Sequence, residues 1–168
     1  VTRQWTSDDF ADSVIDVPEF ENNSVTVGEN KLCINLSNNA DPGDLSKQAT
    51  VSFNKKYQDD FALEFNVDYK STNYAQQRYL MVTFGNSYSL VFIPSYAQVH
   101  LIGGVDFKTG ATVMNMSDAE LSAASIKVVR SGNNMTFYIN GSQFGTTQTY
   151  TEEFVKIGVK AHRVVADI

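Results

Sequence analysis

Two acidic side chains, Glu64 and Asp68, stand in a segment with strand-like alternation, DFALEFNVDYK (60–70). Successive side chains of a strand point to opposite faces, so these two carboxylates share one face with Asn66. A pair of carboxylates can hydrolyse a glycosidic bond when the two groups are about 5–5.5 Å or about 6.5–9.5 Å apart. Residues four apart on a strand have Cα atoms about 13 Å apart, from a rise of roughly 3.3 Å per residue. This spacing is long for catalysis, and a solvent-facing polar strand side or a glycan-contacting face explains the same residues.

A second set of side chains suited to ligand binding lies between residues 74 and 100. A sugar ring has an apolar face and a rim of hydroxyl groups, and tyrosine offers both a flat ring and a hydroxyl group. The sequence therefore predicts a ligand-binding platform made of Tyr74, Arg78, Tyr79, Tyr96, Gln98 and His100. The alternative is that the tyrosines are there because tyrosine suits strands.

Oxygen ligands for a hard cation occur together in NNADPGD (38–44). Asn39, Asp41 and Asp44 could bind calcium on a turn, because calcium prefers oxygen ligands. The alternative is an ordinary turn, since Asp-Pro-Gly-Asp is typical of one. No other cofactor is expected, and no His or Cys spacing indicates zinc.

The elements that would position these groups are short strands separated by turn residues. Strand-like runs occupy residues 24–30, 31–37, 49–56, 60–70, 77–85, 88–95, 97–104, 125–131, 135–141 and 154–168. Regularly spaced short strands of this kind favour a β-sandwich or barrel. Helix signals are few: a capping-box pattern at 117–120 predicts one short turn, and Ser7 with two following acids could cap another.

Hairpin signals are concentrated in SIKVVRSGNNMTFYINGSQFGTT (125–147). Apolar and polar residues alternate on each side of Gly-Asn-Asn at 132–134, which tolerates positive φ and can close a turn. Asn-Gly at 140–141 is the strongest two-residue hairpin signal. Strands with one apolar face each predict two antiparallel sheets that bury those faces against each other.

Composition sets further bounds. The 168 residues fit a single β-sandwich domain spanning 1–168, and a chain of this length buries about 70% of its unfolded surface. A net charge of -6 at pH 7 makes nucleic acid an unexpected partner. No apolar run reaches about 18 residues, so no membrane span is expected. The lone Cys33 is interpreted as a small hydrophobic residue on a strand.

Three stretches resemble the concanavalin A-like lectin/glucanase superfamily, in its laminin G-like and bacterial glycan-associated branches. They are 60–70, 125–147 and 154–168, and TSDDFADS (6–13) also resembles the entry segment of these domains. The resemblance implies an all-β jelly-roll sandwich of two antiparallel sheets, one convex and one concave. It places the predicted platform on the concave face.

The resemblance also carries expectations for individual residues. Glucanases of the superfamily use alternating acids, Glu-x-Asp-x-Glu, on one strand, whereas this chain has Asn66 in the middle and the shorter Asp68 last. Members often hold calcium, and Asp167 matches an acid on their closing strand. Because Asn66 and Asp68 depart from the glucanase pattern, the chain is expected to be non-catalytic rather than an enzyme.

The function expected from these observations is a non-catalytic carbohydrate-binding or adhesion module of a bacterial protein, with a polysaccharide or glycan as partner. Val1 is no initiator Met and the chain ends abruptly, so we expect a removed leader, further domains of a larger chain, and a secreted, periplasmic or cell-surface location. Two alternatives remain: a glycoside hydrolase of the glucanase-like type, and a structural or protein-interaction domain without a sugar site. The shape of the concave face, open or filled by the protein itself, distinguishes the binding module from the structural domain.

Overall fold

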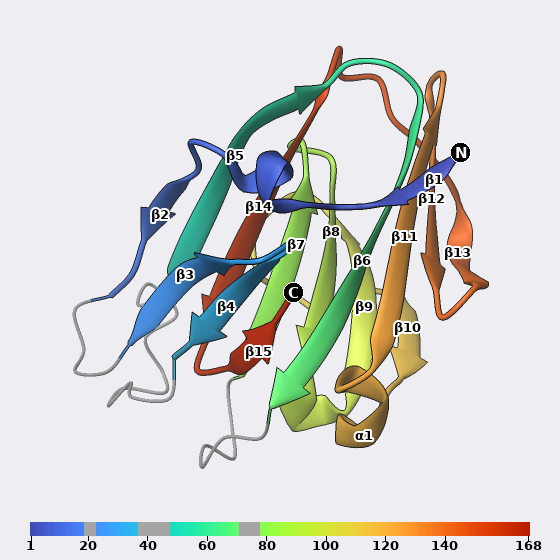
Figure 1. Cartoon of the computed structure of the whole chain (residues 1–168). Coiled ribbons are helices and arrows are strands. Elements are labelled where there is room, and N and C mark those ends of the chain that lie inside the picture. The colour runs from blue at the N-terminus through green and yellow to red at the C-terminus, as the bar shows by residue number, and fades with distance from the viewer. Residues whose placement is uncertain (19–22, 37–47, 71–77) are drawn as a thin grey trace.

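Two β-sheets lie face to face in the computed structural model, which describes residues 1–18, 23–36, 48–70 and 78–168 (Figure 1). The first sheet has eight strands. One of them, β1 (Thr2–Gln4), pairs in parallel with β6 and lies outside the order of the other seven. The other pairings among the described strands of this sheet are antiparallel. From one edge to the other it contains β13 (Ser142–Thr149), β12 (Asn134–Ile139), β11 (Ala124–Ser131), β6 (Phe61–Lys70), β15 (Val165–Asp167), β4 (Lys31–Asn35) and β3 (Ser24–Gly28).

The second sheet has seven strands, all paired in antiparallel fashion where they are described. Its order is β10 (Thr112–Asn115), β9 (Gln98–Gly103), β8 (Tyr88–Ile93), β7 (Tyr79–Phe84), β14 (Val155–His162), β5 (Ala49–Tyr57) and β2 (Val14–Asp16). The strand β14, from the C-terminal end of the chain, pairs with β5 on one side and with β7 on the other. The prediction of an all-β sandwich is therefore confirmed.

The hairpins form where the sequence predicted them. Ser131 pairs with Asn134 across the turn between β11 and β12, and Gly132 in that turn has a φ of 58°. Asn140 and Gly141, between β12 and β13, have φ values of 49° and 82°. Asn and Gly tolerate this left-handed region best, so the residue types explain both tight turns.

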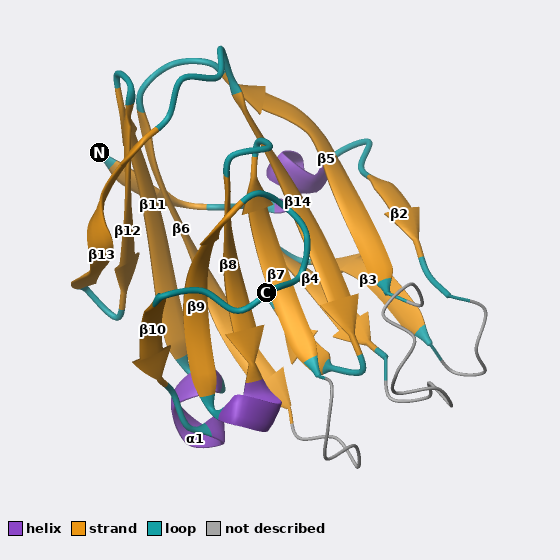
Figure 2. Ribbon diagram, turned by 180° about the vertical axis from the view of Figure 1, so that it is seen from behind, coloured by secondary structure: helices purple, strands orange, loops and turns teal. Residues whose placement is uncertain are grey.

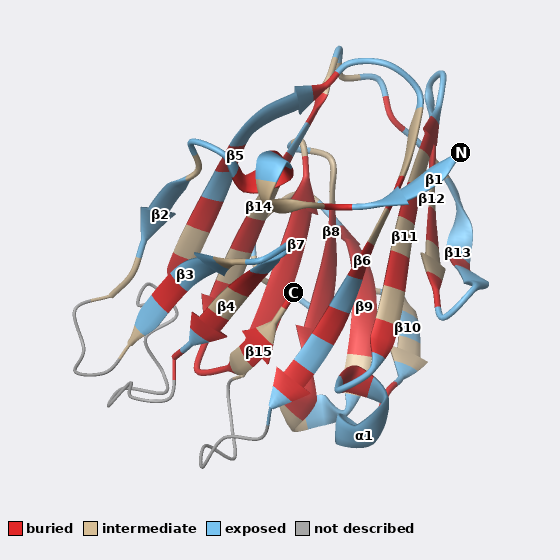
Figure 3. Ribbon diagram, in the orientation of Figure 1, coloured by how far each residue is buried: buried red, intermediate tan, exposed pale blue. Residues whose placement is uncertain are grey.

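The core lies between the inner faces of the two sheets. Figure 3 shows buried bands alternating along β6 and β11 with more exposed ones, as expected for strands with one face in the core. Leu63, Phe65 and Val67 of β6 are each at most 1% exposed. Arg130 ends the buried row of β11, where its guanidinium group donates to the carbonyl oxygens of Glu152, Glu153 and Gly132. Its buried charge is therefore well hydrogen-bonded.

Three short helical turns occur in the described residues: η1 (Ser7–Phe10), η2 (Pro94–Tyr96) and α1 (Asp118–Leu121). The predicted capping box is present at α1, where Ser117 Oγ accepts from the Glu120 amide at 3.2 Å and Glu120 accepts in return at 3.1 Å. The turn near Ser7 also forms, but its N-cap residue is Thr6, one position earlier than the sequence indicated. None of these helices is long and apolar enough to cross a membrane, in the part of the chain that is described.

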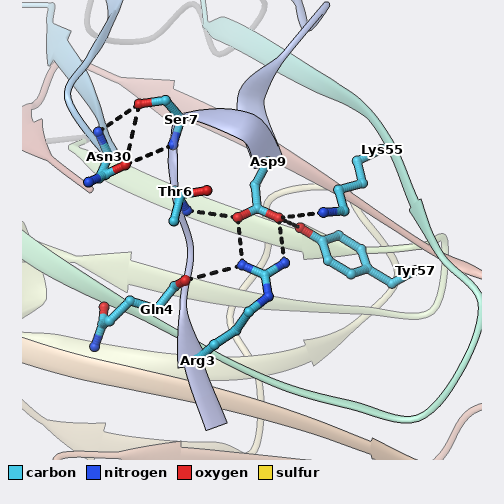
Figure 4. A network of polar contacts seen from close by, with 8 residues as sticks. All are labelled: Arg3, Gln4, Thr6, Ser7, Asp9, Asn30, Lys55 and Tyr57. Carbon is cyan, nitrogen blue, oxygen red and sulfur yellow. Dashed lines mark hydrogen bonds and ion pairs between the residues drawn. The ribbon is translucent and has the colours of Figure 1, made fainter.

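Buried Asp9 ties the N-terminal segment to β5 (Figure 4). Its carboxylate, which is 0% exposed, accepts two hydrogen bonds from Arg3 at 2.8 and 2.9 Å. Tyr57 Oη donates to it at 2.5 Å, the Thr6 amide donates at 2.7 Å, and Lys55 Nζ lies 3.3 Å away. Because each carboxylate oxygen has at least two partners, burial of this charge is compensated.

The contacts around Asp9 also govern its protonation. Burial alone raises the pKa of Asp9, but the hydrogen bonds from Arg3, Tyr57 and the Thr6 amide outweigh burial and hold the pKa well below its usual range. Burial and the Asp9 carboxylate both raise the pKa of Tyr57. At neutral pH the Asp9 carboxylate is therefore ionised, and the Tyr57 hydroxyl group keeps its proton.

Replacing Asp9 by asparagine is expected to lower the free energy of unfolding at pH 7 by about 2–3 kcal/mol, because buried donors lose a charged acceptor. An acid whose pKa is lower in the folded chain stabilises the fold above its unfolded pKa of about 3.9, and this contribution is lost as the pH falls further. The wild-type chain should therefore lose more stability than Asp9→Asn between pH 5 and acid pH. Urea unfolding across this range measures both effects, with Asp8→Asn at the exposed neighbour as control. Parallel acid profiles for the two proteins would contradict the expectation.

Candidate functional site

The strands of the predicted platform form the centre of the seven-stranded sheet. On β7, Leu80 and Val82 pack into the core, whereas Tyr79 and Met81 belong to a separate apolar cluster on the outer face. Residues of β7 therefore alternate between the core and the outer face of the sheet. The outer face of this sheet is where the platform was expected.

The protein covers the centre of this outer face with its own chain. Figure 2 shows the connection between β9 and β10, residues 104–111, crossing in front of the sheet. Phe107 in this connection stacks on Tyr79, with ring centroids 4.3 Å apart and an interplanar angle of 27°. On its other flank Tyr79 stacks on His162, with ring centroids 5.4 Å apart. The buried members of this outer cluster are Tyr79, Met81, Val91, Ile93 and Ile102.

Tyr79 is consequently unavailable to a ligand in this arrangement. Its side chain is 1% exposed, and its hydroxyl group donates to Gln48 Oε1 at 2.5 Å. Burial raises the pKa of Tyr79 well above its usual range. The ring acts as a packing residue beneath Phe107 rather than as an open stacking surface.

Hydrogen bonds hold the covering connection at both ends. Lys160 Nζ donates to the Val105 carbonyl oxygen at 2.6 Å, and the Gly110 amide donates to His100 Nδ1 at 3.0 Å. His100 Nε2 lies 2.9 Å from Gln98 Oε1. Burial lowers the pKa of His100, although the Gly110 bond opposes this shift. Because Nδ1 accepts from Gly110, a neutral His100 carries its proton on Nε2 and donates it to Gln98.

The structure describes two of the three remaining platform residues. Tyr96 lies in η2 and is 59% exposed, whereas Arg78 precedes β7 and donates to Tyr69 Oη at 2.5 Å. Tyr74 lies outside the described residues. The three candidate calcium ligands, Asn39, Asp41 and Asp44, also lie outside them. Within the described ranges, no group of three or more His, Cys, Asp or Glu residues could hold a metal ion.

Beside the covering connection, the same outer face is hollowed into a groove of about 300 Å³. Its floor is a row of small residues across three strands, because Gly158 of β14 pairs with Ser52 of β5 and with Thr83 of β7. The groove is lined by Ser52, Thr83, Gly85, Asn86, Val105, Glu152, Phe154, Lys156, Ile157, Gly158 and Lys160. Sequence reasoning missed this site, because residues 154–168 were interpreted only as a closing strand.

Gly158 keeps the floor of the groove low. A Cβ atom at this position would lie 2.7 Å from Thr83 Oγ1 and 3.3 Å from the Val51 carbonyl oxygen, so a side chain would clash with its neighbours. Its outward neighbours along β14, Lys156 and Lys160, stand two residues to either side and rise as the walls. The groove is therefore a depression between two lysines.

Several polar groups of the groove are left for a ligand or solvent. Among the described residues, no hydrogen bond involves the hydroxyl groups of Ser52 and Thr83 or the side-chain amide of Asn86. Phe154 supplies an apolar ring at the wall, and Lys56 Nζ lies 4.7 Å from its ring centroid. Hydroxyl, amide and ammonium groups beside one half-buried aromatic ring are a combination suited to binding a sugar.

The single carboxylate in the groove is firmly held at the rim. Glu152 Oε2 accepts from the Asn86 amide at 2.9 Å and from Ser87 Oγ at 2.5 Å, over the turn between β7 and β8. Gly85 makes this approach possible, because a side chain at position 85 would clash with that oxygen. Among the described lining residues no second carboxylate faces Glu152, so the groove offers no acid pair for glycoside hydrolysis.

The acids considered first lie on the opposite sheet. Glu64 accepts from Ser125 Oγ at 2.5 Å, and Asp68 lies directly across from Asp167 on the paired strands β6 and β15. Asp68 and Asp167 line a pocket of about 220 Å³ on that outer face. Burial raises the pKa of Asp167, but Lys31 and Lys70 outweigh burial and lower it. Asp167 is therefore ionised at neutral pH and is no proton donor.

Comparison with known proteins identifies the fold. No family model matches the sequence, and no curated protein matches it. Among solved structures, the carbohydrate binding module CBM66 from Bacillus subtilis superposes with a TM-score of 0.56 at 12% identity, covering 86% of this chain and 87% of that one. The exoplasmic/lumenal domain of VIP36, in its Ca²⁺/Man-bound form, gives a TM-score of 0.65 at 6% identity, covering 93% and 80%. The polysaccharide lyase family 7 alginate lyase AlgAT5 gives 0.58 at 7% identity, covering 89% and 79%.

These similarities confirm the predicted fold as a concanavalin A-like jelly-roll sandwich. Its neighbours include a carbohydrate-binding module, a lumenal domain in a Ca²⁺/Man-bound form and an alginate lyase, so the fold by itself does not select one activity. A choice among them has to come from the groove and its side chains.

Proposed function

We propose that this chain is a non-catalytic glycan-binding module, and that the groove on the outer face of the seven-stranded sheet is its binding site. The observation that carries the proposal is a depression of about 300 Å³ whose floor and walls present hydroxyl, amide and ammonium groups beside the ring of Phe154. Among the described residues, those hydroxyl and amide groups have no hydrogen-bond partner from the protein. Ligand-binding sites typically combine an apolar surface with a few polar groups that can bond to the ligand.

The chemistry of the groove favours binding over cleavage. Hydrolysis of a glycosidic bond requires an acid and a second carboxylate on either side of it, and Glu152 stands alone among the described groove residues. The pair Asp68–Asp167 on the other sheet includes one acid whose pKa is lowered, whereas the proton donor of a glycosidase needs a raised pKa. A glucanase-like activity is therefore not proposed.

A carbohydrate-binding role also fits the similarity to a carbohydrate-binding module and to the Ca²⁺/Man-bound VIP36 domain, and extends it to this chain. The partner that we propose is an extracellular or cell-surface polysaccharide, so the proposal carries with it a secreted, periplasmic or cell-surface location. An array of plant, bacterial and host glycans, followed by titration calorimetry with each positive ligand, tests the proposal. Absence of binding across the array would contradict it.

Replacing Phe154 by alanine is expected to weaken glycan binding about five- to tenfold, since the sugar loses the apolar surface at the groove wall. The matched control is Tyr138→Ala on β12, because Tyr138 also carries a lysine over its ring, at 4.4 Å, but belongs to the other sheet. Titration calorimetry of both variants against the same ligand measures the difference. Equal losses in the two variants would place the binding site elsewhere.

A further inference from the structure

We infer that the groove selects an anionic saccharide, one whose sugar units carry carboxylate or sulfate groups. This inference rests on the proposed function, and it names the class of glycan that the site would take. It comes from the distribution of charge around the groove, which differs from that of the whole chain.

Two lysines, Lys156 and Lys160, line the groove on either side of Gly158, and a third, Lys56, lies next to Lys156. Lys156 and Lys56 are paired directly across β14 and β5, and Lys160 stands on the same face of β14 four residues beyond Lys156. Residues four apart on a strand lie about 13 Å apart, so the lysines of β14 stand at the two sides of the floor. The whole chain has a net charge of -6, which makes this positive cluster a local feature.

The pair Lys56–Lys156 has no compensating acid. Like charges directly opposite each other on a sheet are destabilising. Among the described residues, no carboxylate lies within ion-pair distance of either ammonium group. Lys56 contacts only the ring of Phe154 in this region, at 4.7 Å from the centroid. An anion bound between the two lysines would remove their repulsion, because it would give both ammonium groups a counter-charge.

The two carboxylates near the groove leave this positive surface accessible. Glu152 is held at the rim by the Asn86 amide and Ser87 Oγ, on the β7–β8 turn. Asp106 approaches Lys160 at 3.7 Å, but its side chain is 98% exposed. An exposed ion pair of this length contributes little, so a ligand anion can replace Asp106 beside Lys160 at low cost.

The remaining groups of the groove favour a ligand that is a saccharide as well as an anion. The hydroxyl groups of Ser52 and Thr83 lie on the floor, where they can bond to sugar hydroxyl groups, and Phe154 can pack against a pyranose face. A simple polyanion would use the lysines and leave these groups unsatisfied. The geometry therefore predicts discrimination between a charged sugar polymer and other polyanions.

Matched polymers test the inference by titration calorimetry at low and moderate salt. Polygalacturonate is compared with its fully methyl-esterified form, dextran sulfate with dextran, and an oligothymidylate serves as a polyanion without pyranose rings. We expect at least tenfold tighter binding to the charged member of one pair than to its neutral counterpart, with affinity falling as salt rises. Polygalacturonate and dextran sulfate distinguish a carboxylate from a sulfate ligand.

Lys156→Gln is expected to weaken that binding about tenfold, through loss of a charge-assisted contact. Lys127→Gln on β11 removes the same charge from the other sheet and should leave affinity unchanged. Equal binding of neutral and charged polymers, or an unaffected Lys156→Gln, would overturn the anionic preference while leaving glycan binding intact. If the oligothymidylate bound as tightly as the charged saccharide polymers, the saccharide preference would be overturned. If no polymer bound and the glycan array were also negative, both the inference and the proposed function would fall.

Discussion

Replacing Trp5 by alanine should lower the free energy of unfolding by about 3–5 kcal/mol, the cost typical of deleting a fully buried large aromatic side chain. Trp5 is 3% exposed and stacks on Phe65, with ring centroids 4.2 Å apart and an interplanar angle of 13°. It also contacts Phe53 at 5.7 Å and the edge of Phe10 at 5.2 Å. Because Phe65 belongs to β6 and Phe53 to β5, the indole ring joins the two sheets.

The measurement needs a probe other than fluorescence, because Trp5 is the only tryptophan of the chain. Guanidinium unfolding followed by circular dichroism gives the free energy for both proteins. Trp5→Phe is the control, since it keeps a ring against Phe65 and should cost about half as much. Single domains have a stability of about 5–15 kcal/mol, so Trp5→Ala should remain measurable but fragile. A loss below about 1 kcal/mol would show that the N-terminal segment contributes little to the core.

Most of the sandwich follows from local patterns. Alternation of apolar residues in 60–70 and 125–139 predicts both the strands and their buried faces. Side chains of a strand alternate between its two faces, so every second residue being apolar marks the face that is buried. Asn140 and Gly141 fix the turn, because few residues other than Asn and Gly adopt positive φ easily. The strands and the turns could be predicted because each depends on residues that are adjacent in the sequence.

The elements that the sequence did not predict are short strands supported by their partners. β2 (Val14–Asp16) is three residues long, and Val14 is 69% exposed, so no buried apolar face predicts this strand from the sequence. It exists because β5 offers an open edge for pairing. The expected closing strand at 154–168 is divided in two, since Arg163 adopts a φ of 55° and turns the chain from β14 into β15 on the other sheet.

The site was harder to foresee than the fold, for a physical reason. Alternation placed Tyr79 on the outer face, but the covering connection reaches it from residue 107, and no local pattern shows where a loop will lie. Likewise Ser52, Thr83 and Gly158 are far apart in sequence and become neighbours only because β14 pairs with both β5 and β7. A sequence pattern predicts the two faces of a single strand, whereas a groove depends on which strands are paired side by side in the sheet.

Filling the groove should have the largest effect on binding. Ser52→Trp is expected to weaken glycan affinity at least a hundredfold, a change of about 2.7 kcal/mol or more. Ser52 is exposed and lies directly opposite Gly158, which has no side chain, so an indole ring at position 52 can extend over the floor of the groove. Substitutions at exposed positions usually change stability by less than about 0.5 kcal/mol, so the fold should persist. Titration calorimetry with the best ligand from the glycan array measures the loss.

Thr26→Trp provides the matched control, because Thr26 is an exposed residue on β3 of the other sheet and receives the same added ring. Guanidinium unfolding of both variants separates a blocked groove from a damaged fold. A folded Ser52→Trp protein that binds as tightly as the wild type would remove this groove as the binding site. A loss confined to Ser52→Trp would instead localise recognition to the row of small residues formed by Ser52, Gly158 and Thr83, and would explain why β14 carries glycine between two lysine-bearing positions.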